Sequence, residues 1–150
     1  MVALRLAILA LVPQALLADC GDWHSAALTT YESYPDLGSE ECLAYNGCTW
    51  AGQFYGLPEP QSEDWVASNN IVAVHEKDWN WLGLKVLEVR QGDLHVRATA
   101  FDLCADTDCD GCCTANLGGD GYLIDMEVNT AARFGASGGI VDFRVCDRAP

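Results

Sequence analysis

Apolar and polar residues alternate most regularly between positions 94 and 104. A two-residue period predicts a β-strand that buries one face and exposes the other. The stretch ends in Asp102-Leu-Cys104, so the strand delivers an acid and a cysteine to its own end. We therefore expect Asp102 to lie where this strand leaves the sheet.

A second informative stretch is organised around Asp125. Tyr122-Leu-Ile leads into this acid, and the residues from Met126 to Phe134 suit a short helix. Gly135 follows the run, and glycine is the residue that most often ends a helix. The pattern predicts one short helix with Asp125 as its N-cap.

Shorter runs predict the remaining strands. Apolar or alternating residues of strand length occupy 70–75, 84–90 and 139–146. Gln91-Gly-Asp93 is a turn signal between the second of these and the strand at 94–104. Short strands joined by tight turns, with one short helix, predict an all-β barrel.

Three motifs in this order resemble a known superfamily. They are Asp102-Leu-Cys104, Ile-Asp125 before the short helix, and Gly139-Ile-Val at the start of the last strand. They are similar to motifs of the double-psi β-barrel proteins, which include expansins, barwins, kiwellins and rare lipoprotein A. The resemblance covers roughly residues 45–146 and implies a six-stranded double-psi β-barrel with one short helix, stapled by disulfides.

The sequence departs from this family pattern at two places. Ala105 stands where the family has proline after Asp-x-Cys, and Glu127 stands where it has serine after Asp-Leu. Thr49-Trp50-Ala-Gly52 is similar to the family's opening strand, and Gly52 and Gly56 would allow another chain to approach closely. The resemblance is therefore more specific for fold than for activity.

The N-terminus reads as a secretory signal. One positive charge, Arg5, is followed by an apolar run without acids and by small residues before Asp19. We predict a signal peptide at 1–18, an N-terminal arm at 19–41 and the double-psi β-barrel domain at 42–150. The mature protein is expected to be secreted, with no membrane association after cleavage.

All eight cysteines follow the predicted signal. An even number of cysteines in a secreted domain predicts up to four disulfides in an oxidising compartment, and their pairing is left open by the sequence. They are Cys20, Cys42, Cys48, Cys104, Cys109, Cys112, Cys113 and Cys146. Adjacent cysteines such as Cys112 and Cys113 are expected to bond elsewhere, tying their loop to two places.

The chain is strongly acidic, with 22 Asp and Glu against 8 Lys and Arg and a net charge of −14. Nucleic acid and anionic membranes are poor partners for such a surface. Acidic polysaccharides are disfavoured for the same reason. Neutral glucans, chitin or a basic protein remain as partners, and the acidity also serves solubility.

Two carboxylates that face one groove can perform acid–base work on a glycosidic bond. The resemblance implies that Asp125 takes the position of the general acid in related hydrolases, with Asp102 nearby. Those hydrolases also use an acid in the first strand, and 49–52 contains none. This absence favours a binder over an inverting hydrolase, while a lytic transglycosylase needs only one acid. The alternative is that Asp102 ties crossing loops together and Asp125 caps its helix.

Aromatic side chains that could stack on sugar rings are candidates for substrate binding. Two of them, Trp79 and Trp81, would share a face if they lie on a strand. His75 follows an apolar strand and is a candidate sugar contact or proton carrier, or else a hydrogen-bonded strand-end histidine. The predicted substrate-binding residues are Trp50, Tyr55, His75, Trp79 and Trp81, and core packing is the alternative for each aromatic.

The cysteine-rich loop contains residues that could bind a metal. Asp106, Asp108 and Asp110 match the first positions of a calcium loop, but Leu117 replaces its bidentate acid. The spacing of Cys104, Cys109 and Cys112 resembles an iron–sulfur motif or a zinc site. The signal peptide and the number of cysteines favour disulfides instead, so no metal and no cofactor is predicted.

The sequence thus predicts a secreted, expansin-like or barwin-like protein that binds a neutral cell-wall polysaccharide without efficient hydrolysis. One alternative is a glycan-cleaving enzyme, endoglucanase-like or a lytic transglycosylase, with Asp125 as general acid. The other is a kiwellin-like protein that binds and inhibits another protein. Whether the chain is an enzyme stays open, with the balance toward a binder.

Overall fold

The computed structural model describes residues 20–45 and 47–146. Its strands are β1 (His24–Tyr31), β2 (Ile71–His75), β3 (Val86–Gln91), β4 (Leu94–Cys104), β5 (Tyr122–Glu127) and β6 (Gly139–Cys146). Its short helices are α1 (Glu40–Tyr45), α2 (Glu63–Ser68), α3 (Trp79–Leu82), α4 (Cys112–Ala115) and α5 (Val128–Phe134), with 3-10 turns η1 (Glu76–Asp78) and η2 (Asp106–Asp108). The predicted signal peptide lies outside the described residues.

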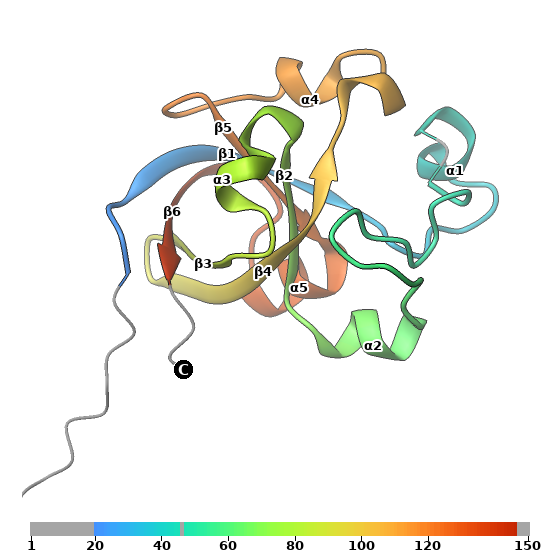
Figure 1. Cartoon of the computed structure of the whole chain (residues 1–150), viewed down its shortest axis with the longest axis horizontal. Helices are drawn as coiled ribbons and strands as arrows, with labels where there is room; N and C mark the ends of the chain where they lie inside the picture. The colour runs from blue at the N-terminus through green and yellow to red at the C-terminus, as the bar shows by residue number, and fades with distance from the viewer. Residues whose placement is uncertain (1–19, 46, 147–150) are drawn as a thin grey trace, which may run out of the picture.

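The six strands close into one barrel in the order β1-β5-β2-β4-β3-β6 (Figure 1). The β1–β5 and β2–β4 pairs are parallel, and the other four pairs are antiparallel. Closure pairs every strand on both sides, so the barrel has no open sheet edge. The predicted six-stranded, disulfide-stapled double-psi β-barrel is confirmed, but the described residues form five short α-helices and not the single one that was predicted.

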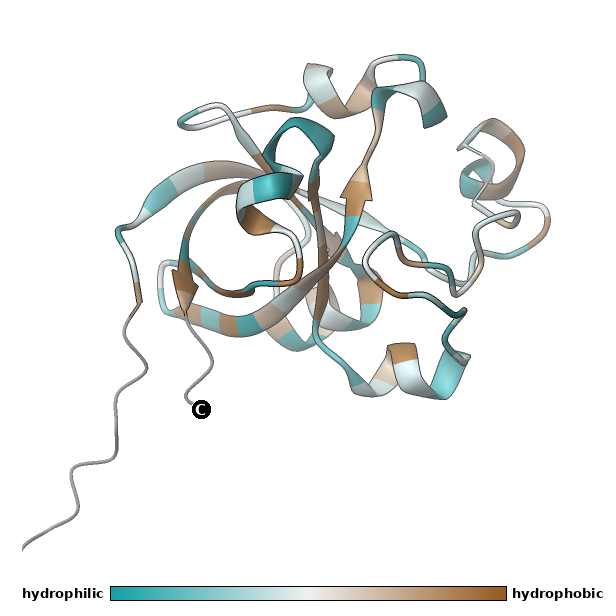
Figure 2. Cartoon of the chain, viewed as in Figure 1, coloured by the Kyte–Doolittle hydropathy of each residue, from teal (hydrophilic) through white to brown (hydrophobic). Residues whose placement is uncertain are grey.

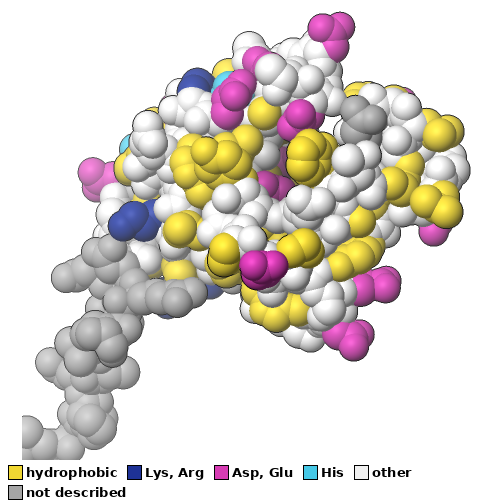
Figure 3. Space-filling view, turned by 45° about the vertical axis from the view of Figure 1, so that its right-hand side comes forward, with side chains coloured by type: hydrophobic (Ala, Val, Ile, Leu, Met, Phe, Trp, Pro, Cys, Tyr) yellow, Lys and Arg dark blue, Asp and Glu magenta, His cyan; other side chains and the backbone are white. Residues whose placement is uncertain are grey.

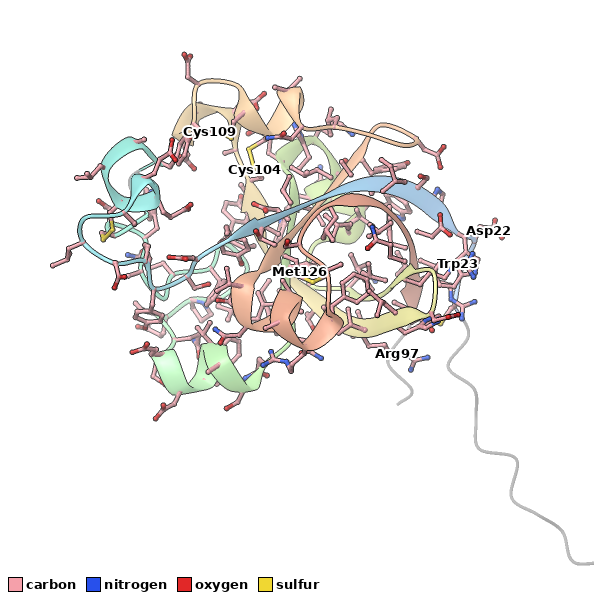
Figure 4. All side chains as sticks on the ribbon, turned by 180° about the vertical axis from the view of Figure 1, so that it is seen from behind. Asp22, Trp23, Arg97, Cys104, Cys109 and Met126 are labelled. Carbon is pink, nitrogen blue, oxygen red and sulfur yellow. A yellow bond between two sulfur atoms is a disulfide. The ribbon has the colours of Figure 1, made fainter. Side chains whose placement is uncertain are left out.

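Apolar side chains fill the barrel interior, and Figure 2 shows hydrophobic segments along the central strands. All five residues of β2 are buried, which explains why this strand reads as a continuous apolar run. In Figure 4 the side chain of Met126 lies within the barrel. Other fully buried core residues are Val72, Val74, Leu87, Val89, Ala100, Ile124 and Phe143.

The barrel begins earlier than the predicted domain boundary. Residues 24–31, which we assigned to an arm ending at 41, form β1, and this strand pairs with β5 and β6. Only Ala26 and Leu28 of this segment are buried. Because most of its residues are small, the sequence shows little contrast between the buried face and the exposed one. The stretch 49–56, predicted as the opening strand, contains turns instead, and Gly52 adopts a φ of 71° there.

The predicted helix after Asp125 is present, but it starts later. Asp125 lies inside β5, and α5 begins at Val128. The N-cap is Glu127, whose carboxylate accepts a hydrogen bond of 2.8 Å from the backbone N–H of Asn129. Gly135 ends α5 with a φ of 92°, as predicted. The interpretation of Asp125 as a helix cap is therefore wrong, and the acid is a barrel residue.

All eight cysteines form disulfides, as predicted. The pairs are Cys20–Cys146, Cys42–Cys48, Cys104–Cys113 and Cys109–Cys112. The first pair joins the two ends of the barrel chain across 126 positions, and the last two hold the loop after β4. No helix in the described residues is long and apolar enough to span a membrane.

Candidate functional site

A cavity of about 470 Å³ opens at one end of the barrel. Its walls come from the end of β1, from α1, from the turns at 50–55, and from the end of β4 with the disulfide-bonded loop that follows it. Figure 3 shows a hollow on this face with acidic side chains inside it and hydrophobic groups beside it. The cavity brings Asp102 and Asp125 together with Trp50 and Tyr55, as the sequence interpretation required.

The barrel register places the two acids on either side of one small residue. Ala73 of β2 is the partner of Asp102 on β4 and of Asp125 on β5. All three residues line the cavity. Neighbouring strands lie about 4.8 Å apart, so the two inter-strand spacings across β2 separate the acids by about 10 Å at the backbone. The alanine methyl leaves the space between the carboxylates free for a ligand.

Asp125 is held by β1. The Thr29 hydroxyl donates a hydrogen bond of 2.7 Å to Asp125 Oδ1. Burial raises the pKa of Asp125 from its ordinary 3.8 to about 7, while the Thr29 bond lowers it and the charges of Glu41 and Asp102 raise it. Asp125 is therefore a group that can hold or release a proton near neutral pH.

Asp102 ties a crossing loop to the end of β4. Its Oδ1 accepts hydrogen bonds from the backbone N–H groups of Tyr55, at 2.9 Å, and Leu103, at 3.0 Å. Burial raises its pKa to about 6 against the effect of these two bonds, and the charge of Asp108 adds to the rise. Asp102 thus has a structural role, which the sequence allowed, and also faces the cavity.

Three exposed aromatic side chains line the cavity, those of Trp50, Tyr55 and Tyr45. Trp50 is 52% exposed and Tyr55 is 66% exposed, so both rings are accessible to a ligand in the cavity. Trp79 supports the second ring from behind, with ring centroids 4.9 Å apart in an edge-to-face arrangement. Exposed rings beside polar groups suit contact with the apolar faces of sugar rings.

Trp79 and Trp81 do not form one binding face. They lie on α3, where a spacing of two residues turns side chains by about 200°, so the expectation of a shared strand face is wrong. Trp81 packs instead against His24, Tyr122 and Phe143. Neither tryptophan lines the cavity.

His75 also lies outside the cavity wall. It is buried, its Nδ1 accepts from the backbone N–H of Lys77 at 3.1 Å, and its Nε2 lies 2.9 Å from the Thr114 hydroxyl. Thr114 in turn donates to Asp106 at 2.6 Å. These contacts match the interpretation of a hydrogen-bonded strand-end histidine, and they tie the loop after β4 to β2.

In the loop after β4, the residues considered as metal ligands form disulfides or hydrogen bonds with other residues of the protein. Cys104, Cys109, Cys112 and Cys113 are paired as disulfides, so their sulfurs are not the thiolates that a cluster or zinc would need. The Asp106 carboxylate accepts from the backbone N–H and hydroxyl of Thr114, at 2.8 and 2.6 Å. The loop is a disulfide-bonded wall of the cavity.

The structure adds cavity residues that the sequence interpretation missed. Tyr31 and Ser33 line the cavity, and their hydroxyl oxygens are buried without a hydrogen-bond partner among the described residues. Burial, with the charges of Asp102, Asp125 and Glu127, raises the pKa of Tyr31 well above its ordinary value, against the opposing effect of the nearby Ser33 hydroxyl. The two hydroxyl groups are thus close to each other, although their geometry is not that of a hydrogen bond. The signal was present in the sequence, because Thr29, Tyr31 and Ser33 are polar residues at a spacing of two in and after one strand.

Comparison with known proteins finds similarity among solved structures. No family model and no curated protein matches the sequence. Among solved structures, the chain is similar to the apo expansin of Clavibacter michiganensis, with 17% sequence identity and a TM-score of 0.47. The match covers 86% of this chain and 52% of that one, so the chain spans about half the length of the solved protein.

Proposed function

We propose that this protein is secreted and binds a neutral cell-wall polysaccharide in the cavity between Asp102 and Asp125, without efficient hydrolysis. The observation that supports this most is the pairing of exposed rings, Trp50 and Tyr55, with polar groups inside one open cavity. Rings provide apolar contact with sugar faces, and carboxyl and hydroxyl groups provide hydrogen bonds to sugar hydroxyls. Four disulfides fit an extracellular location.

The state of the two acids argues for binding rather than hydrolysis. An inverting hydrolase needs one protonated and one ionised carboxyl group flanking the bond, with water positioned by the second. Here the oxygen Oδ1 of Asp102 is engaged by two backbone N–H groups, and its pKa is raised to about 6. The raised pKa makes Asp102 a stronger base than an ordinary aspartate, but the two hydrogen bonds fix the carboxylate and occupy one of its two oxygens. Asp102 is therefore a restrained base.

A glycan-cleaving enzyme is the second candidate because of Asp125. A carboxyl group with a pKa of about 7 inside a cavity has the property of a general acid. In this role Asp125 would donate its proton to the glycosidic oxygen, and Thr29 would hold the resulting carboxylate by its hydrogen bond. A transglycosylase reaction needs no further carboxylate, since a hydroxyl of the sugar itself attacks.

The test is a pull-down of the oxidised protein on cellulose, chitin and peptidoglycan, with assay of released sugar. Trp50→Ala should weaken binding about three- to tenfold, the worth of one aromatic contact. The matched control is Trp81→Ala, which removes a partly exposed tryptophan outside the cavity and should bind like the wild type.

The outcomes separate the candidates. Binding without sugar release, unchanged in Asp125→Asn, supports the binder. Release that disappears in a folded Asp125→Asn protein establishes the enzyme instead. Absence of binding to all three polymers overturns both and directs the search to protein partners.

A further inference from the structure

The cavity contains acids without basic partners. Within the described part of the chain, no Lys, Arg or His lines it. The acidic residues on its wall are Glu32, Glu41, Asp102, Asp108 and Asp125. A concave site lined by charges of one sign concentrates the field and attracts a ligand of opposite charge.

Several basic residues are engaged elsewhere on the barrel. Arg144 binds Glu88 at 2.8 Å, and Arg90 binds Asp142 at 3.0 Å. Both guanidinium groups also stack on Trp23, at 3.8 Å for Arg90 and 4.4 Å for Arg144. Figure 4 shows Trp23 and Arg97 at the far end of the molecule from Cys104 and Cys109, which line the cavity.

The acids of the cavity act on one another. The charges of Glu41 and Asp102 raise the pKa of Asp125, and the charge of Asp108 raises that of Asp102. Burial and two neighbouring glutamates, Glu32 and Glu40, raise the pKa of Glu41. A cation placed among these groups would relieve their repulsion and favour their ionised forms.

The hydroxyl groups of Tyr31 and Ser33 indicate that a cationic ligand of this cavity should also carry hydrogen-bonding groups. Ser33 is only 7% exposed, and its Oγ has no hydrogen-bond partner among the described residues. Tyr31 Oη is in the same state on the same wall. Buried hydroxyl groups without partners are costly, so a ligand that bonds to them gains affinity.

We propose that the cavity selects an amino-sugar polymer with free amino groups, such as deacetylated chitin, over the corresponding neutral glycans. This inference rests on the part of the proposed function by which the cavity binds a polysaccharide, and it replaces the neutral polymer named there by a cationic one as the preferred ligand. An ammonium group lies between Asp102 and Asp125, the sugar hydroxyl groups bond to Tyr31 and Ser33, and sugar rings contact Trp50.

The test is calorimetric titration of the oxidised protein near pH 6 with three hexasaccharides of glucosamine, N-acetylglucosamine and glucose. At low salt we expect the glucosamine oligomer to bind at least about tenfold more tightly than the other two. About 0.5 M NaCl should remove most of this preference. Asp102→Asn and Glu41→Gln should each reduce it, whereas Asp93→Asn, in the exposed β3–β4 turn, should leave it unchanged. Thermal unfolding checks that each variant is folded.

Each outcome decides between specific alternatives. Equal binding of all three oligosaccharides overturns the amino-sugar preference and leaves the proposed function standing. Binding of none of them overturns both. Tighter binding of a lysine hexapeptide than of the glucosamine oligomer, in competition at the same cavity, overturns the sugar assignment in favour of a basic protein segment. A salt-sensitive preference for the glucosamine oligomer that is lost in the cavity variants supports the proposal.

Discussion

The substitution Asp125→Asn should stabilise the protein above neutral pH, because burial in the folded state disfavours the ionised form of this carboxyl group. The pKa of Asp125 is about 7 in the folded protein, against an ordinary 3.8. The folded state therefore binds the proton more tightly than the unfolded chain, and the free energy of unfolding falls as pH rises from about 4 to about 7. Asparagine does not titrate and can still accept the hydrogen bond from Thr29.

The magnitude follows from the difference between the two pKa values. Each pKa unit corresponds to about 1.4 kcal/mol, so the full difference is worth about 4 kcal/mol above pH 7. Part of the rise comes from the charges of Glu41 and Asp102, which titrate in their own right, so we expect about 2–4 kcal/mol at Asp125. Small domains have total stabilities of about 5–15 kcal/mol, and the effect is therefore readily measured.

Chemical denaturation at about pH 4 and about pH 8 measures this effect. The wild type should lose stability between the two pH values, and Asp125→Asn should lose less, so that the variant is the more stable protein at the higher pH. Asp93→Asn is the control, since it removes an acid from an exposed turn. A difference between Asp125→Asn and the wild type that is the same at both pH values, or a variant less stable at pH 8, would refute the reasoning.

Three further predictions concern the support of the site. Thr29→Val removes the hydrogen bond to Asp125 and should raise the pKa of Asp125 by about one unit, as measured by carbon NMR of the carboxyl group. Thr29→Ser keeps the hydroxyl group and should leave this pKa unchanged. A lower pKa of Asp125 in Thr29→Val would contradict the prediction. Replacing both Cys20 and Cys146 by alanine frees a loop of 126 positions and should cost about 5 kcal/mol in urea denaturation, and a loss below about 1 kcal/mol would be against it. Gly56→Ala would place a methyl group 2.9 Å from a backbone oxygen of β4, and should destabilise the protein by about 1–3 kcal/mol and weaken glycan binding; an unchanged unfolding midpoint would show that the turn can move.

Strands with a regular period were predictable from local sequence. The alternation at 94–104 corresponds to β4, and 139–146 corresponds to β6 with the same bounds. The predicted strands at 70–75 and 84–90 differ from β2 and β3 by one or two residues. β1 escaped prediction because alanine, serine and threonine give a weak hydrophobic contrast, and only its place in the closed barrel shows which side is buried.

The aromatic residues show the limits of this reasoning most clearly. The sequence grouped Trp79 and Trp81 by a spacing of two, which is meaningful on a strand and misleading on a helix. The structure places them on α3, so one supports Tyr55 and the other packs on Tyr122. Trp50, in contrast, lies in a turn and not in a helix or strand, so no periodic pattern in the sequence could predict that its side chain is exposed.

By itself the sequence determined the barrel class, the disulfide bonding of the cysteines, the acidic character and the identity of two candidate acids, because these depend on periodicity, composition and short motifs. Only the tertiary structure decided that Asp102 and Asp125 flank Ala73, and that Tyr31 and Ser33 face the same cavity. These contacts join β1, β2, β4 and β5, which are far apart in the chain. Barrel closure sets their register, and no local pattern contains that information.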